Sequence, residues 1–200
     1  MNTQNRPLTI GILALQGAYE AHAKILATLG IATKLLRTPD ELTNLDGLII
    51  PGGESTTMLK FLERNQFLDA LTTFVQTTPT FGTCAGAILL AKDVQHPAQT
   101  SLAAMDVTVE RNAYGRQIDS TILTADTALP GGPLEMVFIR APRISRLTEG
   151  IETLATRDSF PVLVRQGHLL AATFHPELSA DTRVHQLFLD LIRKNVPAVG

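Results

Sequence analysis

Cys84 is the only cysteine of the chain, and glycines stand two residues to either side of it, at Gly82 and Gly86. The residues before it, Pro79 to Phe81, are extended in character, and Ala85 to Ala91 form a helix-compatible run of small and apolar residues. This pattern is typical of a nucleophile elbow, a sharp strand-to-helix turn that projects a nucleophile above a sheet. A helix N-terminus there would favour the thiolate. A buried structural cysteine fits the same segment, because free cysteines are among the most buried residues.

His175 is the candidate base for this thiol. It follows a strand-like segment, Leu169 to Phe174, and in parallel α/β sheets sites collect at the carboxyl ends of strands. Pro176 biases His175 toward an extended backbone, in which His175 and Glu177 would point to the same side. The carboxylate could then orient the imidazole, which predicts a Cys-His-Glu triad. A surface histidine and half of a metal site are the alternatives; the other histidines show no paired spacing, which disfavours metal.

The segment Pro51 to Ser55 (PGGES) offers flexible backbone amides after a strand-like run. The amides of Gly53 and Ala85 could form an oxyanion hole. A plain glycine turn with Ser55 or Thr56 as a helix cap explains the segment as well, and it lacks the lysine of a phosphate-binding loop. Arg111 and Arg140 could meet a substrate carboxylate, although ordinary surface ion pairing explains each of them more simply.

Periodicity predicts the elements that position these residues. Strands are expected over 8–15, 32–36 and 47–50, and helices over 19–29, 55–64 and 67–77. This alternation predicts an α/β fold with a mostly parallel sheet. Short alternating segments over 105–140 predict an antiparallel or mixed extension beside that sheet. Further strands are expected over 153–156, 161–165 and 169–174, with a hairpin turn at 166–168, and a last helix, capped by Asp181 or Thr182, should reach residue 195.

Length and composition limit the number of domains, the binding partners and the compartment to be expected. Two hundred residues with 44% hydrophobic content predict a single domain over 1–200. The net charge is −2 and no basic cluster occurs, so binding to nucleic acid or an anionic membrane is not expected. We find no signal peptide and no apolar run long enough to span a membrane, and a lone cysteine suits a reducing compartment, so we expect a cytoplasmic protein.

Several blocks in a fixed order carry a resemblance that covers nearly the whole chain. They are LALQGA at 13–18, PGGESTTM at 51–58, GTCAG at 82–86, RNAYGRQ at 111–117, FIRAP at 138–142 and HPEL at 175–178. Cys84, His175 and Glu177 lie in blocks that resemble the triad signature of class I glutamine amidotransferases. The whole set is similar to the PdxT family, the glutaminase subunits of pyridoxal 5'-phosphate synthase.

The resemblance implies a three-layer, flavodoxin-like α/β fold and a glutaminase that converts L-glutamine to glutamate and ammonia through a glutamyl thioester. It implies Cys84 as nucleophile, with His175 and Glu177 completing the triad. We expect no cofactor and no metal. It also implies glutamine contacts at Gly53, Glu54, Ser55, Arg111, Ile139 and Arg140, and places Gln16 near the oxyanion loop and a partner interface.

The implied partner is a synthase subunit in a large hetero-oligomer, which receives the ammonia and on which the glutaminase becomes active. Two alternatives stay open at this point: a γ-glutamyl hydrolase or peptidase on the same scaffold, and a non-catalytic regulatory subunit.

Overall fold

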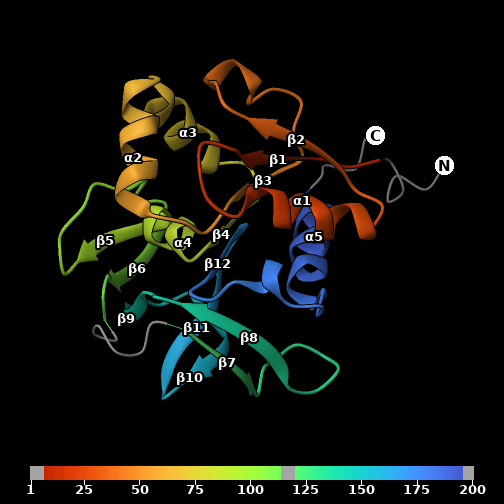
Figure 1. Cartoon of the computed structure of the whole chain (residues 1–200), viewed down its shortest axis with the longest axis vertical. Helices are drawn as coiled ribbons and strands as arrows, with labels where there is room; N and C mark the ends of the chain where they lie inside the picture. Colours follow the sequence, from red (N-terminus) through yellow and green to blue (C-terminus); the bar gives the residue numbers. More distant parts are fainter. Residues whose placement is uncertain (1–6, 114–119, 196–200) are drawn as a thin grey trace.

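The computed structural model describes residues 7–113 and 120–195 (Figure 1). Its main sheet has the strand order β10-β11-β12-β4-β3-β1-β2. From β12 to β2 neighbouring strands are parallel, while β10, β11 and β12 pair antiparallel at the other end. The strands are β1 (Thr9–Leu13), β2 (Ala32–Leu36), β3 (Gly47–Ile50), β4 (Thr80–Thr83), β10 (Glu152–Arg157), β11 (Phe160–Gln166) and β12 (Leu169–Ala172).

Helices cover both faces of this sheet, as expected for strands that are apolar on both sides. One face packs against α1 (Tyr19–Thr28) and α5 (Arg183–Asn195), and the other against α2 (Ser55–Arg64), α3 (Phe67–Val75) and α4 (Ala85–Leu90) (Figure 1). Alternate residues of one strand feed the two cores: Ile49 packs with the first group, and Leu48 and Ile50 with the second. The predicted three-layer α/β fold is confirmed.

Two small sheets lie beside the main one. β5 (Ala91–Gln95) pairs parallel with β6 (Met105–Glu110), and β6 pairs antiparallel with β9 (Arg143–Leu147). β7 (Ser120–Ala125) and β8 (Leu134–Ile139) form an antiparallel hairpin. The extension is therefore mixed. The sequence analysis did not anticipate β5 and β9, because both are short and carry charged residues.

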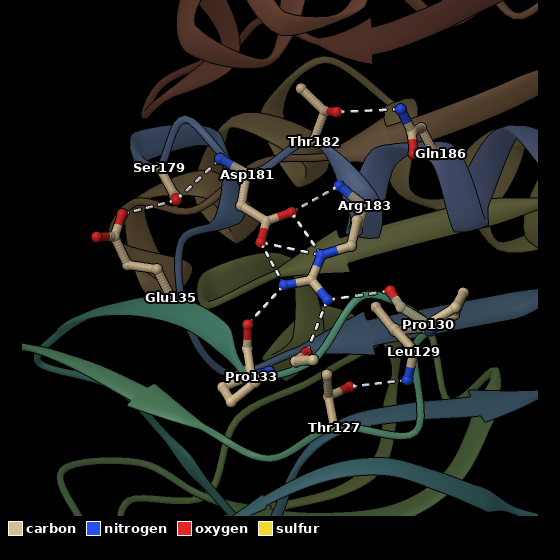
Figure 2. A network of polar contacts seen from close by, with 11 residues as sticks. Thr127, Leu129, Pro130, Pro133, Glu135, Ser179, Asp181, Thr182, Arg183 and Gln186 are labelled. Carbon is tan, nitrogen blue, oxygen red and sulfur yellow. Dashed lines mark hydrogen bonds and ion pairs between the residues drawn. The ribbon is translucent and has the colours of Figure 1, made fainter.

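A polar network fastens the β7–β8 connection to the start of α5 (Figure 2). The Arg183 guanidinium donates to the carbonyl oxygens of Pro130 (3.1 Å), Gly132 (2.8 Å) and Pro133 (2.7 Å), and it pairs with Asp181. An arginine offers several donors in one plane, so a single side chain satisfies carbonyls that a loop of glycine and proline leaves unpaired. The network fixes the hairpin relative to the segment that follows β12.

Among the residues described, no helix has the length and apolar character needed to cross a membrane.

Candidate active site

Cys84 lies on the turn between β4 and α4, with φ of 47° and ψ of −100°. A positive φ is uncommon for a residue with a side chain and marks a conformation held by its surroundings. A Cβ on Gly86 would lie 2.0 Å from the Ile50 carbonyl oxygen, and one on Gly82 would lie 2.6 Å from the Gly86 backbone. Both positions therefore require glycine, and the structure brings the predicted elbow to the carboxyl edge of the sheet.

His175 reaches the same edge because β12 is parallel to β4 and pairs with it directly. The Cys84 N–H donates to the Ala172 carbonyl at 2.8 Å, which locks the two strand ends together. The His175 Nδ1 atom lies 2.7 Å from Glu177 Oε1, and both residues are buried. The His–Glu pairing is thus present in the structure.

The reasoning that predicted this pairing was wrong in one respect. It assumed an extended backbone, whereas residues Pro176–Leu178 form a 3₁₀ turn that starts directly after His175. Proline is well accommodated in the first turn of a helix, because its missing N–H would be unpaired there. In the observed turn the Glu177 carboxylate folds back onto the imidazole.

The surroundings of His175 favour its charged form. Burial lowers its pKa, but hydrogen bonds with Cys84 and Glu177 outweigh that effect and raise the pKa to about 10. The imidazole is therefore protonated at neutral pH. A charged histidine beside the sulfur is the partner that a thiolate nucleophile needs.

The glycine loop after β3 is packed against this pair. A Cβ on Gly52 would lie 2.3 Å from His175 Cε1 and 3.3 Å from Cys84 Cβ, so the loop can approach only as glycine. The Gly52 carbonyl accepts from Ala18 N–H at 3.0 Å. This bond fixes the direction of the peptide that leads into Gly53.

Gln16 supports the same loop from the end of β1. Its Nε2 donates to the Glu54 carbonyl at 3.1 Å, and its Oε1 accepts from the Glu54 N–H at 3.4 Å. A Cβ on Gly53 would lie 2.4 Å from the Gln16 amide nitrogen. The side chain that the resemblance placed near the oxyanion loop is therefore in direct contact with it.

A cavity of about 160 Å³ opens over Cys84. It is lined by every residue that the resemblance implied as a glutamine contact, together with Cys84 and His175. Three further lining residues were not singled out from the sequence: Ile88, Asn112 and Pro142. Asn112 and Pro142 belong to the blocks RNAYGRQ and FIRAP, and Ile88 is four residues after Cys84 on the same helical face. The sequence could therefore have indicated all three residues, two by their place in these blocks and one by its helical spacing from Cys84.

Glu54 caps the N-terminus of α2, a role that was predicted for one of the two residues that follow it. Ser55 or Thr56 was expected to cap α2, but the N-cap is Glu54, whose carboxylate accepts from the N–H groups of Thr56 (3.3 Å) and Thr57 (2.7 Å). Ser55 is buried, and its hydroxyl donates to the side chain of Gln99 instead. The prediction failed because a glutamate placed one residue earlier reaches the same amides.

The charge of Glu54 is fixed by these contacts. Burial raises its pKa, but the hydrogen bonds from Thr56 and Thr57 outweigh that effect and lower the pKa to about 2. Arg111 lies 3.5 Å from the carboxylate and contributes its own charge to the cavity wall. The cavity therefore presents a carboxylate and two guanidinium groups, since Arg140 also lines it.

The opposite wall comes from the end of β8. The Ile139 carbonyl oxygen lies 4.0 Å from Cys84 Sγ, and Arg140 follows with a φ of 43°. The His175 N–H donates to the Val137 carbonyl at 2.8 Å, so β8 supports both the cavity wall and the base. In the part of the chain that the structure describes, no group of three or more His, Cys, Asp or Glu side chains is placed to hold a metal.

Comparison with solved structures gives the class. A crystal structure described as that of a glutamine amidotransferase superimposes with a TM-score of 0.85 at 45% identity, over 92% of this chain and 98% of that chain. The fold is thus that of the glutamine amidotransferases, an amidohydrolase class. Within it, the SNO glutamine amidotransferase family matches residues 12–194, and the chain belongs to that family.

Curated relatives agree along the whole match. A protein of Koribacter versatilis is 58% identical over 186 residues, covering 93% of this chain and 96% of the relative. One of Solibacter usitatus is 49% identical over 186 residues, covering 90% of this chain and 97% of the relative. Both carry the name pyridoxal 5'-phosphate synthase subunit PdxT. The resemblance seen in the sequence is confirmed.

Proposed function

We propose that this chain, as a single glutaminase domain, hydrolyses L-glutamine to L-glutamate and ammonia for pyridoxal 5'-phosphate synthesis, with Cys84, His175 and Glu177 as its catalytic triad. The observation that carries the residue assignment is the buried His175–Glu177 pair at 2.7 Å, joined to the elbow thiol in the wall of the cavity. Family membership supplies the activity class, and the geometry supports these three residues as its agents.

The charges of the cavity suit a free amino acid. Glutamine at neutral pH carries an ammonium and a carboxylate on one carbon and a neutral amide at the far end. Glu54 can accept from the ammonium, and Arg111 or Arg140 can donate to the carboxylate. The amide then reaches toward Cys84, which lines the same cavity. The small cavity and the paired charges favour this substrate over a peptide bound through its main chain.

The chemistry follows from the placement of the groups. The Cys84 thiolate attacks the amide carbon, and the backbone amides of Gly53 and Ala85 stabilise the oxyanion. The His175 imidazolium gives its proton to the departing nitrogen, so ammonia leaves and a glutamyl thioester remains. Neutral His175 then takes a proton from water, the hydroxide attacks the thioester, and glutamate and the thiolate are released. Glu177 holds the imidazole in one orientation throughout.

The product requires a partner. Ammonia in bulk water at neutral pH is mostly protonated and no longer nucleophilic, so it is useful only if it passes directly to the enzyme that consumes it. The curated relatives are named as synthase subunits, and we propose the corresponding synthase subunit as the partner, in a large cytoplasmic hetero-oligomer. Docking would complete the oxyanion site formed by Gly53 and its neighbours.

The test is glutamate release with and without the cognate synthase subunit, comparing wild type with Cys84→Ala and Cys84→Ser. Wild type should release glutamate and be stimulated by the partner, and both variants should be inactive in either condition. Glutamate release at the wild-type rate by Cys84→Ala would refute the assignment. Hydrolysis of γ-glutamyl peptides in preference to glutamine would instead point to a peptidase on this scaffold.

A further inference from the structure

A pair of histidines that does not line the cavity contacts the triad. His22 of α1 and His185 of α5 are fully buried, and the His22 Nδ1 and His185 Nε2 atoms are 3.0 Å apart. The other nitrogen of His22, Nε2, lies 3.1 Å from Thr83 Oγ1 and 3.4 Å from Glu177 Oε2. One imidazole therefore contacts both the triad carboxylate and the residue before the nucleophile.

Glu177 needs a donor at this position. Its side chain is completely buried, and Oε1 is taken by His175. Within the described residues, Oε2 has no hydrogen-bond partner, and the side-chain donor that approaches it is His22 Nε2, at 3.4 Å. A buried carboxylate oxygen without a donor is costly. The His22 ring nitrogen is placed to relieve that cost.

The hydrogen-bond pattern selects one arrangement of protons on the two imidazoles. If His22 carries its proton on Nε2, that N–H donates to Thr83 Oγ1 and its positive end also lies close to Glu177 Oε2, 3.4 Å from the nitrogen, while Nδ1 accepts from His185 Nε2–H. The remaining His185 Nδ1 is then an unpaired acceptor, in agreement with its lack of a partner among the described residues. The reverse arrangement would leave His185 with a buried unpaired N–H and would face Glu177 with a lone pair. The first arrangement is therefore favoured.

We propose that His22 is a positioning residue of the triad: its Nε2–H holds the inner oxygen of Glu177, and His185 fixes the ring in the tautomer that can do so. The inference rests on the proposed triad and deepens it. His22 does not line the substrate cavity, so it acts on the reaction only through the residues it contacts, of which Glu177 belongs to the triad. Without it the carboxylate is free to turn away from His175 Nδ1, and the imidazole is no longer held toward Cys84.

Two substitutions separate this role from simple packing. In His22→Gln the side-chain amide reaches the former Nε2 position and can donate to Glu177, whereas in His22→Asn it reaches only the former Nδ1 position. With the synthase subunit present, His22→Asn should lower kcat about tenfold or more, since a hydrogen bond to a charged group is lost. KM should change by less than about twofold, and His22→Gln should recover most of the loss.

His168→Gln is the matched control. His168 lies in the turn between β11 and β12, before the amino end of β12, and bonds the Val75 carbonyl at the end of α3. Equal kcat in His22→Asn and His22→Gln, or a loss confined to KM, would overturn the proposal. An inactive wild type would refute the glutaminase assignment instead.

If His22→Asn does not fold, His185 gives a second comparison. His185→Gln retains a donor toward His22 Nδ1 and should keep most of kcat. His185→Leu removes that donor and should lower kcat with KM unchanged, and equal kcat values in these two variants would contradict the proposal.

Discussion

Mild acid should destabilise this protein through two of its buried histidines, His22 and His185. Burial lowers the pKa of His185 to about 4, and burial together with the neighbouring His185 and His175 lowers the pKa of His22 well below its ordinary value. His185 stays neutral in the folded protein near pH 5, and the lowered pKa of His22 favours its neutral form as well, whereas in the unfolded chain both rings take up protons below about pH 6.5. Unfolding then binds protons, so the free energy of unfolding falls as the pH falls.

The size of the effect follows from the pKa of His185. A shift from 6.5 to about 4 corresponds to a loss of about 2 kcal/mol between pH 7 and pH 5, at about 1.4 kcal/mol per fully linked proton and pH unit. His22 adds a loss in the same direction. The sum is a substantial part of the roughly 5–15 kcal/mol that stabilises an ordinary domain.

Other shifted groups act mainly outside this pH window. The raised pKa of His175 gives stability that is fully present below about pH 6.5 and is lost as the pH rises toward 10. The lowered pKa values of Glu54 and Asp181 give stability that is lost mainly below about pH 4.5. A decline in the free energy of unfolding between pH 7 and pH 5 therefore reports mainly on His22 and His185.

The assay is urea unfolding followed by circular dichroism at several pH values from 7 to 5, for wild type, His185→Gln and His168→Gln. The glutamine at 185 can still donate to His22 but does not titrate, so this variant should lose about 2 kcal/mol less than wild type over the range. His168→Gln controls for the removal of a histidine elsewhere. If wild type and His185→Gln lose equal stability, the assigned neutral state of His185 is wrong.

Three further predictions concern residues that hold the site and its neighbouring loops in place. Gly52→Ala places a methyl group 2.3 Å from His175 Cε1, so kcat should fall by at least about tenfold in a coupled glutamate assay. Glu54→Ala removes the N-cap of α2 and should cost about 1 kcal/mol in urea unfolding, with a raised KM, whereas Glu54→Asp should retain part of the cap. Arg183→Lys keeps the charge but loses the fork that binds residues 130–133, so the melting temperature should fall and proteolysis within that loop should be faster.

Each of these has a clear contrary result. Gly167→Asn changes a glycine with φ of 56° and no atom within 4 Å of its added Cβ, so a loss of kcat equal to that of Gly52→Ala would remove the steric argument. Equal stability of Glu54→Ala and wild type would mean that the cap is replaced by Ser55 or Thr56. An unchanged protease pattern in Arg183→Lys would show that the loop is held by its own backbone.

The sequence was most informative where local patterns and covalent order coincide. The elbow was predicted from Gly82, Cys84 and Gly86, because the three residues lie within one turn of the chain. The space at Gly82 is limited by the Gly86 backbone of the same turn, although the space at Gly86 is limited by the Ile50 carbonyl of β3. The parallel strands were predicted from apolar runs that are buried on both faces. The 3₁₀ turn after His175 could not be derived from Pro176 alone, since proline is compatible with extended and helical φ values alike.

Contacts between segments far apart in the sequence could not be predicted from residue spacing. His22 and His185 show no paired spacing because they are 163 residues apart, yet α1 and α5 cover the same face of the sheet and bring them to 3.0 Å. The Gln16–Glu54 contact likewise joins the ends of two strands that pair only in the folded sheet. Such contacts depend on strand order, and strand order is a property of the whole chain.

Three histidines within one buried cluster carry opposite pKa shifts, and Glu177 explains the difference. All three are buried, which opposes a positive charge in each case. Glu177 lies between His175 and His22, at 2.7 Å and 3.4 Å, but one carboxylate can balance only one cation. A proton on His175 is also favoured by Cys84, and once it is there its charge lowers the pKa of His22. The arrangement therefore places the single positive charge on His175, beside the sulfur, and keeps His22 and His185 neutral. A neutral His22 can contact Glu177 without competing with the His175 cation for the carboxylate.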